Sequence, residues 1–232
     1  SRSAEAPWQI IYGRARVGGT LAFITTDQGE TGEFFHLVIA IAGHRIKAVE
    51  TLYLDGKPIP FDGSPTFTFP QFASGDYAGL VFMGVNLGDV NQAAQPDLVS
   101  QSSILFPGKW TVDHRGQGIA HVYLILKFHP SIFANGFPEI SFAVQGRDEI
   151  YDPRTGLTGY TDNAALCIAD YWSNSAFGMN ADYENEIDEP VLIDAANTCD
   201  ETVGLNGGGT EKRYTLNGSF LTSERPGDVF GR

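Results

Sequence analysis

The sequence has few cysteines and no long apolar run. Cys167 and Cys199 are the only cysteines in 232 residues. Two are too few for a disulfide framework, which predicts folding in a reducing cytoplasm. The longest apolar run lies near 37–43, far short of the roughly 18 apolar residues that a membrane-spanning helix needs. These absences argue against a disulfide-stapled module, and we predict no membrane insertion.

Basic residues are also scarce. The chain has 15 Lys and Arg against 28 Asp and Glu, which gives a formal net charge of −13. Proteins that bind nucleic acids or anionic membranes need a basic surface, so the balance argues against both classes. Residues 1–148 carry 13 acidic and 10 basic side chains, whereas residues 149–232 carry 15 and 5. This asymmetry predicts two differently built parts.

Aromatic and turn-forming residues are plentiful. The chain has 16 Phe, 9 Tyr, 27 Gly and 12 Pro but only 2 Met, a composition typical of a β-rich fold with many turns. We predict a mainly β protein with an antiparallel barrel-like or sandwich-like domain over 1–147. A smaller α+β segment with two helices is expected over 148–232. Because the sequence stops just after a helix-start pattern at 223–228, we expect this segment to be truncated at its C-terminus.

Strand signals dominate the first part. Gly18-Gly19 separates two alternating stretches, which predicts a hairpin over 9–26. The apolar run at 34–42 indicates a strand buried on both faces. Asp55-Gly56 predicts a tight turn between strands at 46–54 and 57–61. Further expected elements are an edge strand or ordered loop at 66–72, a strand at 79–87, a short helix within 91–103 around Pro96, and a strand at 119–128 that pairs with 140–144 through a turn at Asn135-Gly136.

Helical spacing replaces alternation in the second part. Asp162 or Asn163 is expected to cap a helix that runs to about Trp172. Asp188 is expected to cap a second helix, with Pro190 in its first turn. A flexible glycine-rich connector at 204–210 then leads to a strand at 212–221.

No group of residues has the spacing of a metal site. His121 and His129 lie on one predicted strand, but eight residues apart corresponds to roughly 26 Å. No Cys-x-x-Cys or His-Glu-x-x-His motif occurs. We predict no metal and no cofactor.

An alternating acidic stretch is the one weak calcium candidate. It contains Asp182, Glu184, Glu186 and Asp188. Ile187 stands where a calcium-binding loop has its glycine. A solvated acidic loop whose last residue caps a helix is the favoured interpretation.

Candidate nucleophiles and binding residues are equally sparse. Asp113-His114 has the residue types of half a catalytic dyad, but no serine partner can be assigned from the sequence, so a loop histidine bonded to its neighbours is favoured. Residues 204–210 lack the Lys-Ser/Thr ending of a phosphate loop. The candidates for stacking on sugar rings are Phe67, Phe69, Phe72 and Tyr77. Aromatic residues more often fill a core or a subunit contact. We therefore predict no catalytic residues and no enzyme.

Several stretches carry a family resemblance when taken together. The first part contains Ile10-Ile11-Tyr12-Gly13, the HLVIAIAGH stretch at 36–44, and WTVDHRGQGIA at 110–120. The second contains IYDPRTG at 150–156, DNAALC at 162–167, Ala195-Ala196-Asn197, Cys199-Asp200, and YTLNG at 214–218. In this order and spacing they resemble the tail hub and tip attachment proteins of tailed bacteriophages, the lambda-like host-specificity family.

The resemblance implies a virion structural protein of a phage or prophage. Such a protein is expected at the distal tip of the tail, where it assembles with other tail and baseplate proteins and supports host attachment. It implies a homotrimer in the full-length protein and folding in the host cytoplasm before assembly. Family members are much longer, so the chain is expected to be a fragment. The alternatives are a carbohydrate- or receptor-binding β module and, less favoured, a tail-associated cell-wall hydrolase.

Overall fold

The computed structural model describes residues 6–27, 33–62 and 71–230. The fold is mainly β, as the sequence predicts, with helices that concentrate in the second half of the chain. The chain divides into two compact units, residues 1–9 with 16–144 and residues 10–15 with 145–232. Within the described residues, no helix is long and apolar enough to cross a membrane.

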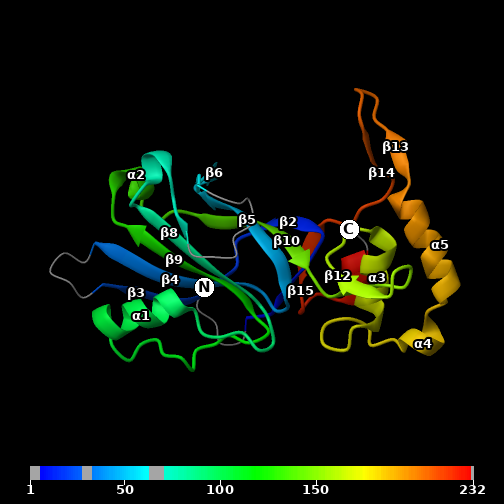
Figure 1. Ribbon diagram of the computed structural model, residues 1–232, viewed down its shortest axis with the longest axis horizontal. Helices are drawn as coiled ribbons and strands as arrows, with labels where there is room; N and C mark the ends of the chain where they lie inside the picture. The colour runs from blue at the N-terminus through cyan, green and yellow to red at the C-terminus, as the bar shows by residue number, and fades with distance from the viewer. Residues whose placement is uncertain (1–5, 28–32, 63–70, 231–232) are drawn as a thin grey trace. The chain divides into compact units, whose positions relative to one another are not determined.

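A five-stranded sheet forms the centre of the first unit (Figure 1). Its strands, in spatial order, are β3 (Thr20–Thr26), β4 (Phe34–Ala42), β9 (Ala120–Lys127), β8 (Val81–Leu87) and β7 (Gln71–Phe72). All four neighbouring pairs run antiparallel. Leu37 lies opposite Leu124, and Leu124 opposite Met83, across the three central strands.

Both faces of this sheet are covered, which explains the continuous apolar run in β4. Leu37, Leu124 and Met83 point to one face and have no exposed surface. On the other face, Val38 and Tyr123 pack with residues around α1 (Pro96–Leu105). A strand buried on both sides has no solvent face that would require polar alternation.

The short helix expected around Pro96 is therefore confirmed as α1. Pro96 occupies its first turn, where the missing N–H costs nothing. Leu98 is fully buried against the sheet, together with Phe106 at the helix end. A 3₁₀ turn at Gly75–Tyr77 and a short helix α2 (Pro130–Phe133) also occur in this unit.

A second sheet has the strand order β2 (Arg14–Val17), β10 (Ile140–Arg147), β5 (Ile46–Leu54) and β6 (Lys57–Pro58). The predicted turn between β5 and β6 is confirmed, with φ of 48° at Asp55 and 77° at Gly56. Asp and Gly tolerate this left-handed conformation, which matches the twist of a tight hairpin.

Two predicted pairings are wrong. Gly18-Gly19 does not close a hairpin, because β2 pairs with β10 whereas β3 pairs with β4 in the other sheet. At Gly19 the backbone passes so close to the Ala40 carbonyl that a Cβ would lie 2.6 Å from it, so this glycine permits a crossing between sheets. Likewise β10 pairs with β2 and β5, not with β9. A local turn signal carries no information on which distant strand is the partner.

The second unit combines short two-stranded pairs with helices. The pairs are β1 (Gln9–Tyr12) with β15 (Gly218–Leu221), β11 (Ile150–Asp152) with β12 (Leu157–Gly159), and β13 (Thr202–Gly204) with β14 (Thr210–Lys212). The helices are α3 (Ala164–Ser173), α4 (Tyr183–Glu186), α5 (Glu189–Asp200) and α6 (Pro226–Phe230). Its core gathers Ile10, Tyr12, Leu166, Ala196 and Phe220.

Both predicted helix starts in this unit are confirmed. Asn163 caps α3 by accepting from the Leu166 N–H, and Asp188 caps α5 by accepting from the Val191 N–H. A side-chain oxygen satisfies an otherwise unpaired amide of the first turn, which fixes where each helix begins. The structure adds α4 and α6 to the two predicted helices.

The prediction for residues 204–221 is wrong in detail. The glycine-rich stretch is the tip of the β13–β14 hairpin, which extends from the end of α5 (Figure 1). The single strand expected at 212–221 is two short strands, β14 and β15. Of the stretch 66–72, residues 66–70 lie outside the described part, and 71–72 form the edge strand β7.

Candidate functional site

The residues that carry the family resemblance in the second half of the chain come together in the second unit. Arg154, in the turn after β11, donates from Nε and Nη2 to the Asp152 carboxylate, at 2.9 and 2.8 Å. Its Nη1 reaches Asp200 Oδ2 at 2.9 Å and Asn197 Oδ1 at 3.3 Å, both at the end of α5. These hydrogen bonds hold the pKa of Asp152 below its usual value. The turn is thereby tied to the helix.

Lys212 extends this network to the start of α3. Its Nζ lies 2.9 Å from Asp162 Oδ1 and 3.0 Å from Asp200 Oδ1. Burial alone would raise the pKa of Asp200, but the hydrogen bonds from Lys212 and Arg154 outweigh it and lower the pKa. Asp200 is therefore a charged link between two cations from distant parts of the chain.

Asn163 joins the same elements from inside. It has no exposed surface. Its Oδ1 caps α3, and its Nδ2 donates to the Ala196 carbonyl of α5 at 2.8 Å. Its backbone forms a bridge with Thr215. Asn163 thus joins two helices through its side chain and the chain that leads to β15 through its backbone.

A second polar group lies beneath α3. The Tyr12 hydroxyl donates a short hydrogen bond to Asp170 Oδ2, and Arg147 Nε donates to the same oxygen at 2.7 Å. Arg147 also lies 3.2 Å from Glu149. Burial raises the pKa of Asp170, and the Arg147 charge opposes the rise. Burial and the Asp170 carboxylate both raise the pKa of Tyr12 far above its usual range.

The charged side chains of these two groups are paired within the second unit. The carboxylates of each group pair with cations or hydroxyls of the same unit, so the charges neutralise one another. The raised pKa of Tyr12 keeps its proton on the phenol, which therefore donates and does not act as a base.

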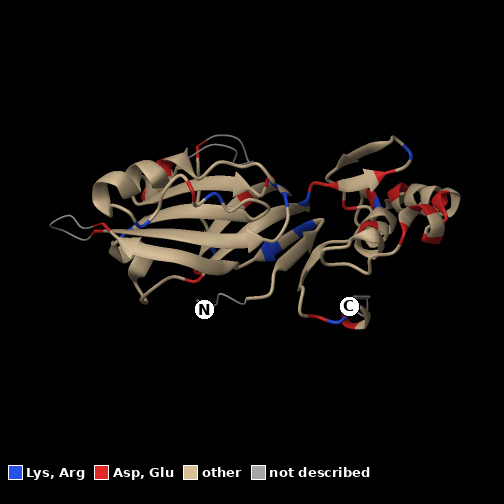
Figure 2. Cartoon of the chain, turned by 90° about the horizontal axis from the view of Figure 1, so that it is seen from below, with Lys and Arg blue, Asp and Glu red and all other residues tan. Residues whose placement is uncertain are grey.

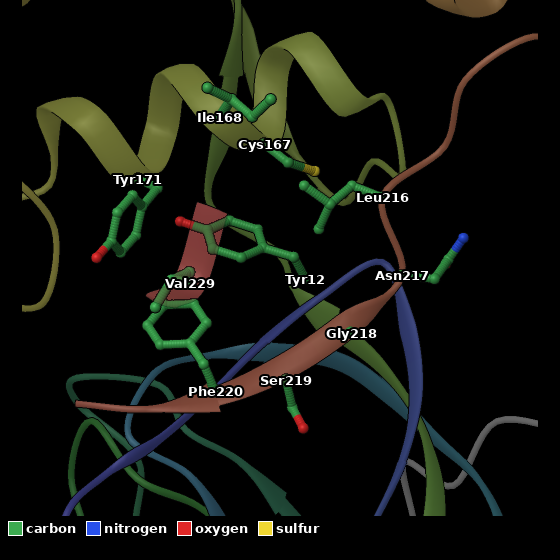
Figure 3. A pocket seen from close by; sticks show the side chains of 10 residues that line it. All are labelled: Tyr12, Cys167, Ile168, Tyr171, Leu216, Asn217, Gly218, Ser219, Phe220 and Val229. Carbon is green, nitrogen blue, oxygen red and sulfur yellow. The ribbon is translucent and has the colours of Figure 1, made fainter. Parts of the chain in front are cut away.

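A pocket of about 370 Å³ opens beside Tyr12 (Figure 3). It lies between α3, β15 and α6, and Figure 3 shows Tyr171, Tyr12 and Phe220 as neighbouring rings on one side of it. Its lining residues are Tyr12, Cys167, Ile168, Tyr171, Leu216, Asn217, Gly218, Ser219, Phe220 and Val229. None of these is a His, Lys or carboxylate, so the lining supplies no general base.

Cys167 supplies the one thiol among the residues that line this pocket. Burial, followed by the nearby Asp170 charge, raises the pKa of the thiol to about 12. The thiol also lies 3.6 Å from the Thr161 carbonyl, to which it can donate. Since the thiolate is the reactive form, the raised pKa disfavours reaction of this thiol near neutral pH.

The hydrogen bonds described for His114 stay within its own loop. His114 Nδ1 accepts from the Thr111 N–H at 3.0 Å, and its ring stacks on Trp110 at 4.9 Å between centroids. The histidine is bonded to its loop neighbours, as the favoured interpretation has it. His129 lies beyond the end of β9 and caps α2 through Nδ1, whereas His121 is buried within β9.

The acidic stretch 182–188 mainly caps helices. Asp182 Oδ1 accepts from the Glu184 N–H at 3.1 Å, and Glu186 Oε2 accepts from the Asp182 N–H at 2.6 Å. Asp188 caps α5. Among the described residues, no group of three or more His, Cys, Asp or Glu side chains is placed to hold a metal ion. The calcium hypothesis gains no geometric support in this part of the chain.

The aromatic candidates are only partly described. Phe67 and Phe69 lie outside the described residues. Phe72 is 69% exposed, and Tyr77 is half-buried in the 3₁₀ turn. Phe72 lines a hollow of about 320 Å³ together with Phe34, Phe82 and His36.

The Tyr12–Asp170–Arg147 group was not found by sequence reasoning. Tyr12 and Asp170 are 158 residues apart, and no local pattern joins them. The sequence contains one signal: Asp170 is the single charged residue in helix 164–173, in which most other side chains are apolar or aromatic. A lone charge in such a helix is expected to be buried with a partner.

Comparisons with known proteins give a limited result. No family model matches the chain, and no curated protein matches it. A search of solved structures finds similarity to a chain described as the virion of a native gene transfer agent particle, with 21% sequence identity and a TM-score of 0.43. The matched region covers 64% of this chain and 28% of that one. The chain therefore spans well under a third of the length of this structural neighbour.

Proposed function

We propose that the chain is a structural component of a phage or prophage tail tip or hub, working through protein contacts and not through bond chemistry. The observation that carries this proposal is that side chains of the motif residues bond to other segments of the same unit. Arg154, Asn163 and Asp200 belong to the stretches that resemble tail hub proteins, and their side chains bond to other parts of the same unit. Residues that hold a scaffold together are expected to bond to neighbouring segments, whereas catalytic residues are expected to face a pocket.

The proposed partners are other tail proteins and further copies of the same protein, as a homotrimer in the full-length form. The proposed location is the distal end of the virion tail, after folding in the host cytoplasm. The acidic surface of the second unit is consistent with such a place, because like charge keeps DNA from adsorbing as it passes.

Immunogold labelling tests the proposal. Antibodies raised against the chain are applied to purified particles from the source culture and viewed by electron microscopy. We expect gold at the distal end of the tail. Gold on the capsid, or on no part of the particle, would refute a tail-tip role. A zymogram against cell-wall material separates the hydrolase alternative, since activity lost in Asp113→Asn or His114→Ala would favour an enzyme.

A second candidate is a carbohydrate- or receptor-binding module. The observation that favours it is the exposed Phe72 ring, which packs against Phe82 at 5.1 Å and lines a hollow that also contains Asp27 and Gln101. An aromatic face beside polar groups suits a sugar ring. A glycan array on which the protein binds, and Phe72→Ala does not, would support it; no binding by either would count against it.

A further inference from the structure

Helix α3 presents an unusual outer side. Its two exposed residues are Ile168 and Trp172, 36% and 43% exposed. They are four residues apart and so share one side of the helix. Its single charged residue, Asp170, is turned inward to Tyr12 and Arg147. Surface helices normally place charged residues on their solvent side, so this side is suited to contact with another molecule.

A preformed hollow lies beside Trp172. It measures about 450 Å³ and is lined by Trp172, Met179, Asn180, Ala181 and Glu186. The loop that forms it is fastened to the end of α3, since the Ala181 N–H donates to the Trp172 carbonyl at 2.8 Å and the Met179 N–H to the Tyr171 carbonyl at 3.1 Å. The shape therefore exists before anything binds.

Two details fix the wall of this hollow. At Gly178 a Cβ would lie 1.8 Å from the Tyr171 carbonyl oxygen, so only glycine allows the loop to fold this closely. Glu186 Oε2 accepts from the Asp182 N–H at 2.6 Å, which holds that carboxylate in place. The hollow thus combines an indole, a half-exposed thioether and an oriented negative charge.

The surroundings favour a cation. No Lys or Arg occurs between Arg154 and Lys212, whereas eleven Asp and Glu do. Figure 2 shows acidic residues gathered over α4 and α5. In the described part of the chain, no ion pair engages Asp182, Glu184 or Glu186. The C-terminal end of α3, at Ser173, adds the negative end of a helix dipole.

We propose that this hollow, the Trp172 site, receives an arginine side chain from a basic segment of another protein. The planar guanidinium stacks on the Trp172 ring while its charge pairs with Glu186, and its methylene stem lies along Met179. Trp is the best aromatic partner for a cation, and arginine stacks on it better than lysine because its head group is planar and weakly hydrated. A second copy of this chain is disfavoured as the occupant, because it would bring a strongly acidic surface against another one.

The test uses two fluorescent peptides of equal charge, hexa-arginine and hexa-lysine, with binding to the intact chain followed by anisotropy at 0.15 M salt. We expect hexa-arginine to bind more tightly than hexa-lysine. Trp172→Ala is expected to weaken hexa-arginine binding by about 3- to 10-fold. Glu186→Gln is expected to weaken it by about 3-fold. Trp172→Phe, which keeps a ring in place, should bind between the wild type and Trp172→Ala.

Matched controls lie on α5. Val191→Ala removes an apolar side chain that is 61% exposed, and Asp194→Asn removes an exposed charge. Both should bind within 2-fold of wild type, and circular dichroism should show all variants folded. If the two peptides bound equally tightly and Trp172→Ala lost no affinity, the binding would be general charge attraction, and the proposal would be overturned. Sedimentation showing that the wild type self-associates, and that Trp172→Ala does not, would assign this surface to a second copy and also overturn it.

Discussion

In the first unit burial lowers the pKa of the histidines His36 and His121, which favours their neutral form, whereas ion pairs tie together distant segments of the second unit. His36 and His121 are 2% and 3% exposed in the first unit, surrounded by the apolar faces of a large sheet. In the second, the Arg147 and Asp170 side chains are each 11% exposed and joined to one another, and Arg154 and Lys212 both reach Asp200. The same chain thus uses two different means of fixing its structure.

The size of the elements explains the difference. A five-stranded sheet with strands of up to nine residues can bury apolar side chains on both faces. The second unit is made of pairs of three- and four-residue strands and short helices, and an isolated pair of strands is barely stable in water. Hydrogen bonds and ion pairs between distant segments supply stability that the smaller apolar core does not.

The largest effect is expected from removing the strand that the second unit takes from the N-terminal end. We propose a boundary between two differently built parts near 147, yet β15 pairs with β1, and Tyr12 belongs to the core of the second unit. A fragment covering 148–232 should therefore lack fixed tertiary structure, seen as poorly dispersed amide signals by NMR.

Adding a synthetic peptide of residues 8–17 provides the control for this prediction. It should restore dispersion in the fragment, whereas a peptide with Tyr12→Ser should not. A fragment of 148–232 that folds cooperatively without the peptide would show that the second unit does not depend on β1.

The next effect concerns the buried ion pair. Arg147→Met leaves the Asp170 carboxylate buried without its cation, and we expect the free energy of unfolding of the second unit to fall by about 3 kcal/mol. Urea unfolding followed by hydrogen exchange in α3 measures this. Leu124→Ala in the first unit should cost a similar amount, about 3 kcal/mol, through loss of apolar contacts. A loss below about 1 kcal/mol for Arg147→Met would show that the second unit does not depend on this ion pair for its stability.

The two units should also differ in their response to acid. Burial lowers the pKa of His36 to about 4 and lowers the pKa of His121, while in the unfolded chain both titrate near 6.5. The unfolded state takes up protons first as the pH falls, so the first unit loses stability from about pH 6.5 downward, of the order of 2 kcal/mol at pH 5 for His36 alone. The lowered pKa values of Asp152 and Asp200 keep their ion pairs intact until the pH falls below about 4.

Hydrogen exchange at pH 7 and pH 5 compares the units directly. Protection in β4 and β9 should decrease between these values, and protection around 152–156 and in α5 should not. His36→Gln, which keeps a polar group near Tyr123, should reduce the loss in the first unit. Equal losses in both units would mean that the buried histidines do not control the acid response.

Local signals in the sequence are sufficient to predict where several strands, turns and helices begin and end. The apolar run of β4, the Asp55-Gly56 turn and the caps Asn163 and Asp188 each depend on a few neighbouring residues. The partners of strands depend on distant residues, which is why the pairings of β3 and β10 were predicted wrongly. The same limit applies to the site, because Asp170 meets Tyr12 from 158 residues away.

The smallest losses in the free energy of unfolding are expected at the exposed ion pairs. Lys212 is 44% exposed and bridges Asp162 and Asp200, so Lys212→Met should cost about 0.5–1 kcal/mol, with less effect in 1 M salt. Arg213 pairs with Glu201 at 2.8 Å, but both side chains are more than 40% exposed, so Arg213→Met should cost at most about 0.5 kcal/mol. Urea unfolding at both salt concentrations gives the ranking of Arg147, Lys212 and Arg213. If Arg213→Met cost as much as Arg147→Met, burial would not determine the strength of these pairs, and the contrast between the units would have to rest on the number of ion pairs alone.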